Sequence, residues 1–258
     1  MVHEFDGKKY EKASAHQNEW GVKLIKELGL EGTEKILDLG CGDGTLTIKL
    51  AELLPEGNVV GIDASQGMID TALPKTMRNA KFLLMDINDL DFEEEFDIVF
   101  SNATLQWVKH HQNMLKNVYL AFRKGGRIRF NFAGDGNCSH FFIVIREAMS
   151  MNEFATHFAE FEWPWYMPSV DEYSKLIKAS EFKDARVWGE NAGRYFPDEK
   201  AMIRWLNQPS LVPFLAHLPI TKKDAFRMFV VKRMIEETKQ NDGRCFETFR
   251  RINLAAIK

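Results

Sequence analysis

The chain has 258 residues, of which 45% are hydrophobic, enough to bury one substantial core. Charged residues make up 28% with both signs mixed and a net charge of -3, which argues against nucleic-acid and membrane-surface binding. The three cysteines, Cys41, Cys138 and Cys245, match neither a disulfide framework nor a metal-ligand spacing. No run is long enough to span a bilayer, and the first residues lack an apolar signal core. We therefore expect a single cytoplasmic domain over residues 1–258, a monomer or weak homodimer, without nucleic-acid or membrane partners.

The first half of the chain alternates between helical patterns and short apolar runs. The stretch of about residues 8–28 carries apolar side chains at helical spacing and ends at Gly29, a residue suited to a helix C-terminus. Each later apolar run predicts a strand. The predicted strands are residues 36–39, 59–62, 81–85, 96–100 and 127–132, with Lys124-Gly125-Gly126 as the turn before the last of them. Strands alternating with helices favour a parallel sheet covered on both faces.

The regular alternation stops after Phe132. Two long helical patterns follow, separated by an aromatic connector, a helix and a strand, and a last strand is predicted near the C-terminus. In chain order these segments are residues 138–161, 162–168, 170–179, 185–188, 197–239 and 246–257. We expect an α/β fold, Rossmann-like and doubly wound, with a mostly parallel seven-stranded sheet. An inserted helical cap is predicted from about 133–168 and 192–240.

The most specific motif is the glycine turn Gly40-Cys41-Gly42-Asp43-Gly44, which follows a buried strand and precedes a helix. A strand, a glycine turn and a helix N-terminus together present backbone N–H groups to a ligand. The spacing G-x-G-x-G differs from the dinucleotide fingerprint G-x-G-x-x-G. Asp38, just inside the strand, would repel a pyrophosphate but suits a ligand with an amino group. The turn therefore favours S-adenosylmethionine over NAD.

Polar side chains also follow the next three predicted strands, at Asp63, Asp86 and Asn102. In an open α/β sheet, ligands bind outside the carboxyl ends of the strands. Asp63 lies about twenty residues beyond the glycines, where an acidic side chain meets a ribose. Asp86 is a candidate acceptor for an adenine amino group, and Met68 a soft apolar face for the ring. The alternatives are a simple turn after the strand for Asp86 and helix packing for Met68.

Four stretches together resemble the class I S-adenosylmethionine-dependent methyltransferases. They are Ile36–Gly44, Val60–Ser65 with Asp86, Phe96–Phe100, and Phe100–Val108. The last stretch contains Ser101-Asn102-Ala103-Thr104-Leu105-Gln106-Trp107 and looks like the trans-aconitate methyltransferase branch. The resemblance implies binding of S-adenosylmethionine, with S-adenosylhomocysteine as the product, and methyl transfer to a small-molecule acceptor.

The resemblance also implies a role for each matching position. The methionine portion would be held by Asp38, Gly40, Cys41 and Gly42, and the ribose by Asp63 and Ala64. The adenine would meet Met68, Asp86 and Ile87, and the sulfonium side would be closed by Asn102, Gln106 and Trp107. The segment covering the cofactor would contribute Tyr10, Ser14 and Gln17.

The acceptor implied by the resemblance is a small acid methylated on a carboxylate oxygen, as in trans-aconitate. A carboxylate is already anionic and needs no general base, so we name no catalytic residue and expect no metal. The candidate acceptor-binding residues are Trp107, Trp165, Arg194 and Tyr195.

Three alternatives remain open from the sequence. One is a different acceptor: an amine, a phenol or an acyl-carrier-bound carboxylate. For an amine or a phenol, His110, His111 and His140 are the candidate bases. The protein could also be an NAD-dependent oxidoreductase, or a protein that binds S-adenosylmethionine without catalysis.

Overall fold

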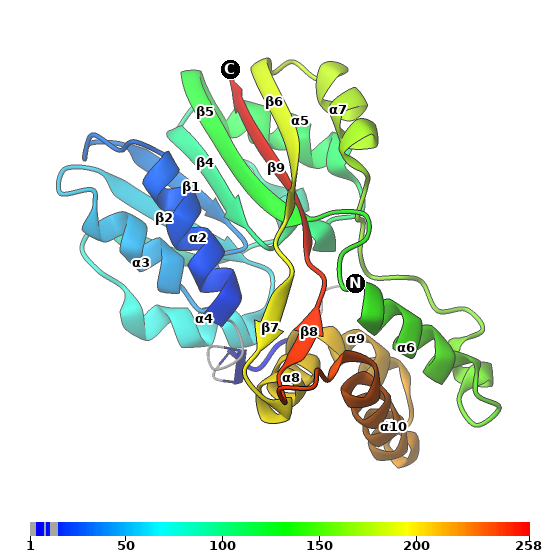
Figure 1. Cartoon of the computed structure of the whole chain (residues 1–258). Helices are drawn as coiled ribbons and strands as arrows, with labels where there is room; N and C mark the ends of the chain where they lie inside the picture. Colours follow the sequence, from blue (N-terminus) through cyan, green and yellow to red (C-terminus); the bar gives the residue numbers. More distant parts are fainter. Residues whose placement is uncertain (1–3, 8, 11–14) are drawn as a thin grey trace. The chain divides into compact units, whose positions relative to one another are not determined.

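The computed structural model describes residues 4–7, 9–10 and 15–258, which form two compact units (Figure 1). The first unit comprises the chain up to Asp135, together with Trp165–Glu190 and Arg251–Lys258. The second comprises Gly136–Pro164 and Asn191–Arg250. Among the described residues, no helix combines the length and apolar character that a membrane span requires.

The first unit is built on a seven-stranded sheet with the order β3-β2-β1-β4-β5-β9-β6 (Figure 1). Its strands are β1 (Lys35–Leu39), β2 (Asn58–Asp63), β3 (Ala80–Leu84), β4 (Phe96–Asn102), β5 (Phe122–Ala133), β6 (Lys183–Asn191) and β9 (Arg250–Ile257). The strands β1 to β5 pair in parallel, and β9 runs antiparallel to β5. The predicted α/β class with a mostly parallel sheet is therefore confirmed.

Helices cover both faces of this sheet because consecutive strand residues point to opposite sides. Ile36 and Ile98 belong to one core, beneath two helices, whereas their neighbours Leu37 and Val99 belong to a second core beneath two others. The first pair is α2 (Ala15–Glu27) with α3 (Thr45–Glu52), and the second is α5 (His111–Ala121) with α7 (Val170–Lys178). A further helix, α4 (Gln66–Ala72), packs against Phe82 of β3. The sheet is thus doubly wound.

The second unit is mainly helical. Its longer helices are α6 (Ser139–Ser150), α8 (Glu199–Trp205), α9 (Val212–His217) and α10 (Ile220–Thr238), and β7 (Arg194–Phe196) pairs antiparallel with β8 (Cys245–Glu247). Aromatic rings fill its centre: the ring of Phe154 lies 5.1 Å from that of Phe226, which lies 5.4 Å from that of Phe158. The two helical patterns that interrupt the strand alternation therefore share one core.

Three predicted elements differ in the structure. The Lys124-Gly125-Gly126 turn lies within β5, at a bulge where the register with β4 shifts. The pattern over residues 138–161 stops being α-helical at Ser150, because Met151 adopts an extended backbone, and resumes as a short 3-10 helix at Ala155–Phe158. The predicted last strand, 246–257, is two strands: β8 pairs with β7, and β9 with β5. Local hydrophobicity does not specify a strand's partner, so the sequence did not reveal this division.

Candidate functional site

The candidate site of the first unit lies at the carboxyl ends of β1, β2 and β4. The strand register places Asp38 beside Gly61 of β2 and Phe100 of β4. Asp63 and Asn102 are the last residues of β2 and β4. We call Asp38, the glycine turn, Asp63 and Asn102 the strand-end site, because the sheet brings all four to one edge.

The glycine turn is tied to the neighbouring strand by its own backbone. The N–H groups of Gly40 and Cys41 both donate to the carbonyl of Ile62, each at 2.8 Å. Gly42 has φ of 56° and its N–H donates to the Asp63 carboxylate at 2.9 Å. At Gly44, with φ of 80°, an added Cβ would lie 2.7 Å from the Phe82 ring. Glycine is therefore required there both for the left-handed backbone and for the close packing of α3 against β3.

Asp38 is a buried carboxyl, only 2% exposed. The Thr47 hydroxyl of α3 donates to its Oδ2 at 2.7 Å. Burial, together with the smaller effect of the nearby Asp63 charge, raises the pKa of Asp38 from 3.8 to about 7, although the Thr47 bond lowers it. Removal from water disfavours the charged form of a carboxyl, so Asp38 is energetically suited to a cationic partner.

Asp63 joins the glycine turn to the start of α4. Its Oδ2 accepts from Gly42, and its Oδ1 accepts from the N–H of Ser65 at 2.9 Å. Burial raises the pKa of Asp63, and the charge of Glu4 adds to the effect, whereas the backbone bonds from Ser65 and Gly42 oppose it. These two bonds fix the orientation of the carboxylate at the end of β2. Ala64 lies between Asp63 and Ser65, the N-cap of α4.

The predicted adenine-binding residues follow β3 or belong to α4, next to the strand-end site. Asp86 follows β3, and the N–H of Met85 beside it donates to the Asp63 carbonyl at 3.0 Å. However, Oδ1 of Asp86 accepts from the backbone and the side chain of Asn88, at 2.9 and 2.8 Å, as in a local turn. Met68 and Ile87 are buried. The structure thus brings Asp86 near Asp63 and gives Met68 a packing role in α4.

Asn102 and Gln17 each carry a buried acceptor oxygen. The Asn102 side-chain amide donates to the backbone carbonyl of Gln17 at 2.9 Å, which ties β4 to α2. Oδ1 of Asn102 and Oε1 of Gln17 are both buried and have no hydrogen-bond partner in the described part of the chain. Ala103, which follows, has φ of 59°, a conformation that non-glycine residues adopt at a cost. A buried orphan acceptor indicates that a donor is missing.

Gln106 and Trp107 belong to a short 3-10 helix, Leu105–Trp107, that follows β4. The side-chain amide of Gln106 donates to the carbonyl of Ala103 at 2.6 Å and accepts from the N–H of Ala133 at 3.2 Å. Gln106 therefore fastens the ends of β4 and β5 together. The Trp107 ring lies 5.3 Å from the Trp165 ring and 5.4 Å from the Phe5 ring, so two predicted acceptor-binding residues are in contact.

Two residues of the amino-terminal segment interact with the strand-end site or with the start of α4 beside it. Burial raises the pKa of Tyr10, the charges of Asp43 and Asp63 raise it further, and the charge of Arg251 opposes them. The Glu4 carboxylate accepts from the Ser65 hydroxyl at 3.2 Å, at the N-terminus of α4. The sequence prediction missed Glu4. Ser14 lies outside the described residues.

His111 was one candidate base for the alternative acceptors. It is buried, with Nε2 2.9 Å from the Leu105 carbonyl and Nδ1 3.0 Å from the Tyr173 hydroxyl. Burial lowers the pKa of His111 to about 4, so the ring is neutral at physiological pH. Both ring nitrogens are occupied, and the imidazole holds the 3-10 helix after β4 in place. His110, in contrast, is the exposed residue that precedes α5.

The other predicted residues lie in the second unit and are described there alone. Arg194 and Tyr195 belong to β7, and Tyr195 is 47% exposed, with its ring 4.9 Å from the Phe246 ring. His140, at the start of α6, has Nδ1 2.9 Å from the buried Glu247 carboxylate. That bond raises the pKa of His140.

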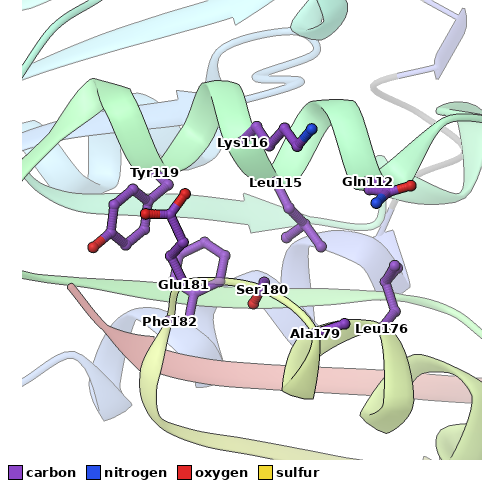
Figure 2. A pocket seen from close by; sticks show the side chains of 9 residues that line it. All are labelled: Gln112, Leu115, Lys116, Tyr119, Leu176, Ala179, Ser180, Glu181 and Phe182. Carbon is purple, nitrogen blue, oxygen red and sulfur yellow. The ribbon is translucent and has the colours of Figure 1, made fainter.

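One pocket of the first unit is lined by other residues. It is formed by α5, the end of α7 and the residues leading into β6 (Figure 2). Leu115, Tyr119, Leu176 and Phe182 contribute apolar surface to it. None of the residues predicted from the sequence lines this pocket. In the described part of the chain, no cluster of three or more metal-ligating side chains is present.

Comparisons with known proteins agree with this geometry. A family described as a methyltransferase domain matches residues 30–176. The chain is 27% identical over 265 residues to a trans-aconitate 2-methyltransferase of Acidovorax sp. (strain JS42), covering 99% of this chain and 98% of that protein. It is 28% identical over 262 residues to an uncharacterized methyltransferase of Schizosaccharomyces pombe, covering 98% of each. A solved structure of loganic acid methyltransferase with SAH covers 100% of this chain and 99% of that chain, with a TM-score of 0.74 at 11% identity, and supports the fold alone.

The chain belongs to the methyltransferase domain family, and it is a class I S-adenosylmethionine-dependent methyltransferase. This assignment confirms the predicted enzyme class and cofactor. It excludes the NAD-dependent oxidoreductase that the sequence had left open.

Proposed function

We propose that the strand-end site holds S-adenosylmethionine and that the protein methylates a carboxylate of a small acid, as a trans-aconitate methyltransferase does. The cofactor part of the proposal is supported by the buried acceptors. A sulfonium and an α-ammonium group are cationic, and the first unit offers them Asp38 and the orphan oxygens of Asn102 and Gln17. A buried acceptor without a donor destabilises the folded protein, and binding of a ligand that donates to it removes this cost.

The remaining cofactor contacts follow from the same edge of the sheet. Asp63, held by Gly42 and Ser65, presents an oriented carboxylate that suits the two ribose hydroxyls. Asp38 with Gly40, Cys41 and Gly42 would hold the methionine portion. The adenine would meet Ile87, Asp86 and Met68, with Ala64 beside the ribose. Tyr10, Ser14 and Gln17 would close over the cofactor, and Asn102, Gln106 and Trp107 would lie on the sulfonium side.

The protonation state and the hydrogen bonds of His111 support a carboxylate as the acceptor. An amine or a phenol must lose a proton on methylation, whereas a carboxylate is ionised beforehand and needs no base. The His111 imidazole contacts the Leu105 carbonyl at the start of the Leu105–Trp107 helix. It is neutral, and both of its nitrogens are hydrogen-bonded to buried oxygens. His111 is therefore a structural support, and the names of relatives that cover 87% and 99% of this chain agree with an acid as acceptor.

When bound, S-adenosylmethionine supplies an activated methyl group on a sulfonium. The residues of this chain then have to align the acceptor, hold it near that methyl group and exclude water. Gln106 and the Trp107–Trp165 ring pair suit this task, because they fix the segment after β4 through backbone bonds and aromatic contacts. Trp107, Trp165, Arg194 and Tyr195 stay our candidate acceptor-binding residues.

A methyl-transfer screen tests the proposal. The full chain would be incubated with S-adenosylmethionine and with panels of polycarboxylic acids, fatty acids, acyl-carrier-bound acids, amines and phenols, and products would be scored by mass. We expect turnover of small free acids. Turnover confined to amines or phenols would contradict the carboxylate assignment, and turnover confined to carrier-bound acids would contradict the small-molecule assignment.

A further inference from the structure

The end of β4 is followed by a backbone conformation that needs support from its surroundings. Ala103 has φ of 59°, in the left-handed region, which costs free energy for a residue with a Cβ. Its N–H donates to the carbonyl of Asn131 in β5 at 2.7 Å. Thr104, the next residue, returns to the right-handed region and precedes the Leu105–Trp107 helix. Strained residues of this kind persist where neighbouring contacts hold them, and they cluster at functional sites.

The Thr104 side chain joins this strained turn to the glycine turn that follows β1. Its hydroxyl donates to the Gly40 carbonyl at 3.1 Å, and the Asn102 carbonyl, at 3.3 Å, is a second acceptor for the same hydrogen. The two turns are also packed together, because a Cβ added at Gly40 would overlap the Thr104 side chain. One side chain therefore holds the end of β4 directly against the glycine turn.

Backbone hydrogen bonds continue from Thr104 in both directions. The N–H of Gly40 donates to the Ile62 carbonyl at 2.8 Å, so the glycine turn is held by β2. On the other side, the N–H of Trp107 donates to the Thr104 carbonyl at 2.9 Å and closes the Leu105–Trp107 helix. Thr104 thus lies between a turn anchored on β2 and the helix that carries two predicted site residues.

A second hydroxyl joins the same two strands in a different place. The Ser101 hydroxyl donates to the carbonyl of Leu39, the last residue of β1, at 2.8 Å. Ser101 is buried inside β4, before the strained residue Ala103, and a structural role in holding two neighbouring strands explains its bond. Thr104 differs because it lies beyond Ala103 and contacts the glycine turn.

We propose that Thr104 is a positioning residue, which fixes Asn102 and the Leu105–Trp107 helix relative to the glycine turn. This inference rests on the proposed function, in which the glycine turn holds the methionine portion and the other two lie on the sulfonium side. Methyl transfer requires the acceptor atom, the methyl carbon and the sulfur to be aligned, and a displacement of about 1 Å can lower a rate about a hundredfold. Thr104 acts through its neighbours, because its hydroxyl is bonded to two backbone carbonyls.

Three variants of the full chain separate the hydroxyl from the packing. Thr104→Val keeps the shape of the side chain without the hydroxyl, and Thr104→Ser keeps the hydroxyl without the methyl group. Ser101→Ala is the matched control, because it removes the other hydroxyl that joins the ends of β4 and β1. Each variant would be measured for its single-turnover rate, with saturating S-adenosylmethionine and an acid that the wild type methylates. Calorimetry would give the affinity for S-adenosylhomocysteine, and urea unfolding the stability.

We expect Thr104→Val to lower the single-turnover rate roughly 5- to 50-fold, while its affinity for S-adenosylhomocysteine falls by about threefold at most. Thr104→Ser should retain most of the rate. Ser101→Ala should lower the stability without a comparable loss of rate. A wild-type rate in Thr104→Val would overturn the proposal. Equal losses of rate in Thr104→Val and Ser101→Ala would also overturn it, because the effect would then follow stability alone.

Hydrogen exchange measures the same connection without an acceptor. Amide exchange would be followed by mass spectrometry with and without S-adenosylhomocysteine, and the N–H of Trp107 reports directly on its bond to Thr104. In the wild type we expect the ligand to slow exchange in residues 103–108 as well as in residues 40–46. In Thr104→Val it should slow exchange in residues 40–46 alone. Protection of both stretches in Thr104→Val would contradict the role of the hydroxyl.

The wild type alone decides if the Thr104 variants do not fold. Protection confined to residues 40–46 would then overturn the proposal, because the end of β4 would not respond to the ligand. A wild type that does not bind S-adenosylhomocysteine would instead refute the proposed cofactor site. A wild type that binds it but methylates no acid would refute the proposed acceptor, and the exchange experiment would still test Thr104.

Discussion

The substitution Asp38→Asn should stabilise the protein and weaken its function at the same time. Asp38 is buried, and it accepts a hydrogen bond from the Thr47 hydroxyl at 2.7 Å. Asparagine has nearly the same shape and retains an oxygen for Thr47, but it cannot ionise. The variant therefore removes the buried charge and leaves the packing of β1 against α3 in place.

The magnitude follows from the pKa of Asp38, which burial raises from 3.8 to about 7. Between these two pH values the native protein holds a proton that the unfolded chain has lost, so stability falls as the pH rises through this window and is constant above it. One pKa unit corresponds to about 1.4 kcal/mol, so the ionised carboxylate destabilises the ligand-free protein by roughly 4 kcal/mol above pH 7. Asp38→Asn lacks this destabilisation because asparagine does not ionise.

Urea unfolding of wild type and Asp38→Asn at pH 4 and pH 8 measures the effect. We expect similar stabilities at pH 4 and a variant that is more stable by roughly 2–4 kcal/mol at pH 8. Calorimetry at pH 8 should show weaker binding of S-adenosylhomocysteine to the variant, since its ammonium group loses a charged partner. A variant that is less stable than wild type at pH 8, or a difference that does not change with pH, would refute this reasoning.

Three further predictions concern other ionisable groups. Asp63→Ala should weaken S-adenosylhomocysteine binding about a hundredfold or more in calorimetry, because two ribose hydroxyls would lose a charged acceptor; unchanged affinity would remove Asp63 from the site. His111→Phe should lower the free energy of unfolding in urea by roughly 2–4 kcal/mol, because two buried oxygens lose their hydrogen bond to the imidazole. Tyr173→Phe should lower it by less. Because the native pKa of His111 is about 4, wild-type stability should also fall as the pH decreases from 6.5 towards 4, and His111→Phe should lack this contribution. In NMR titrations, Glu247→Gln should lower the pKa of His140, whose hydrogen bond to Glu247 raises it; an unchanged pKa would contradict that cause.

The strand-end site was largely predictable because its parts are local. The apolar run, the glycine turn and the following helix lie within residues 35–52, and each has a distinct residue pattern. Asp63 and Asn102 end their strands, so their shared edge followed once the strands were taken as parallel. The orphan state of Asn102 and Gln17 was not predictable, because it depends on how closely α2 packs against β4.

Four buried polar side chains on one face of β5 and β9, Arg129, Asn131, Arg251 and Asn253, illustrate what the sequence left undetermined. Arg129 and Asn131 alternate with Ile128, Phe130 and Phe132, a pattern that already signals a polar strand face. The partner Arg251 lies 120 residues further along the chain from Asn131, and only the antiparallel register of β9 on β5 brings the two together. The same limit applies to His111 and Tyr173, which meet through packing of α5 and α7.

The division of the last predicted strand has a similar cause. No glycine or proline interrupts residues 245–257, and the stretch is rich in apolar side chains, so the sequence alone favoured a single strand. Their assignment to β8 and β9 depends on β7, a three-residue strand too short to be recognised from its pattern. Partner choice in sheets is a tertiary property, so strand existence was predictable and strand pairing was not.

The central claim is that the methyl group is transferred to a carboxylate oxygen. The most direct measurement is the stability of the labelled product in mild alkali, after reaction with S-adenosylmethionine that carries an isotopically labelled methyl group. A methyl ester would release the label as methanol, and this is the result we predict. A label that stays bound to the acceptor through alkali treatment would identify an amine or an ether product and would contradict the account.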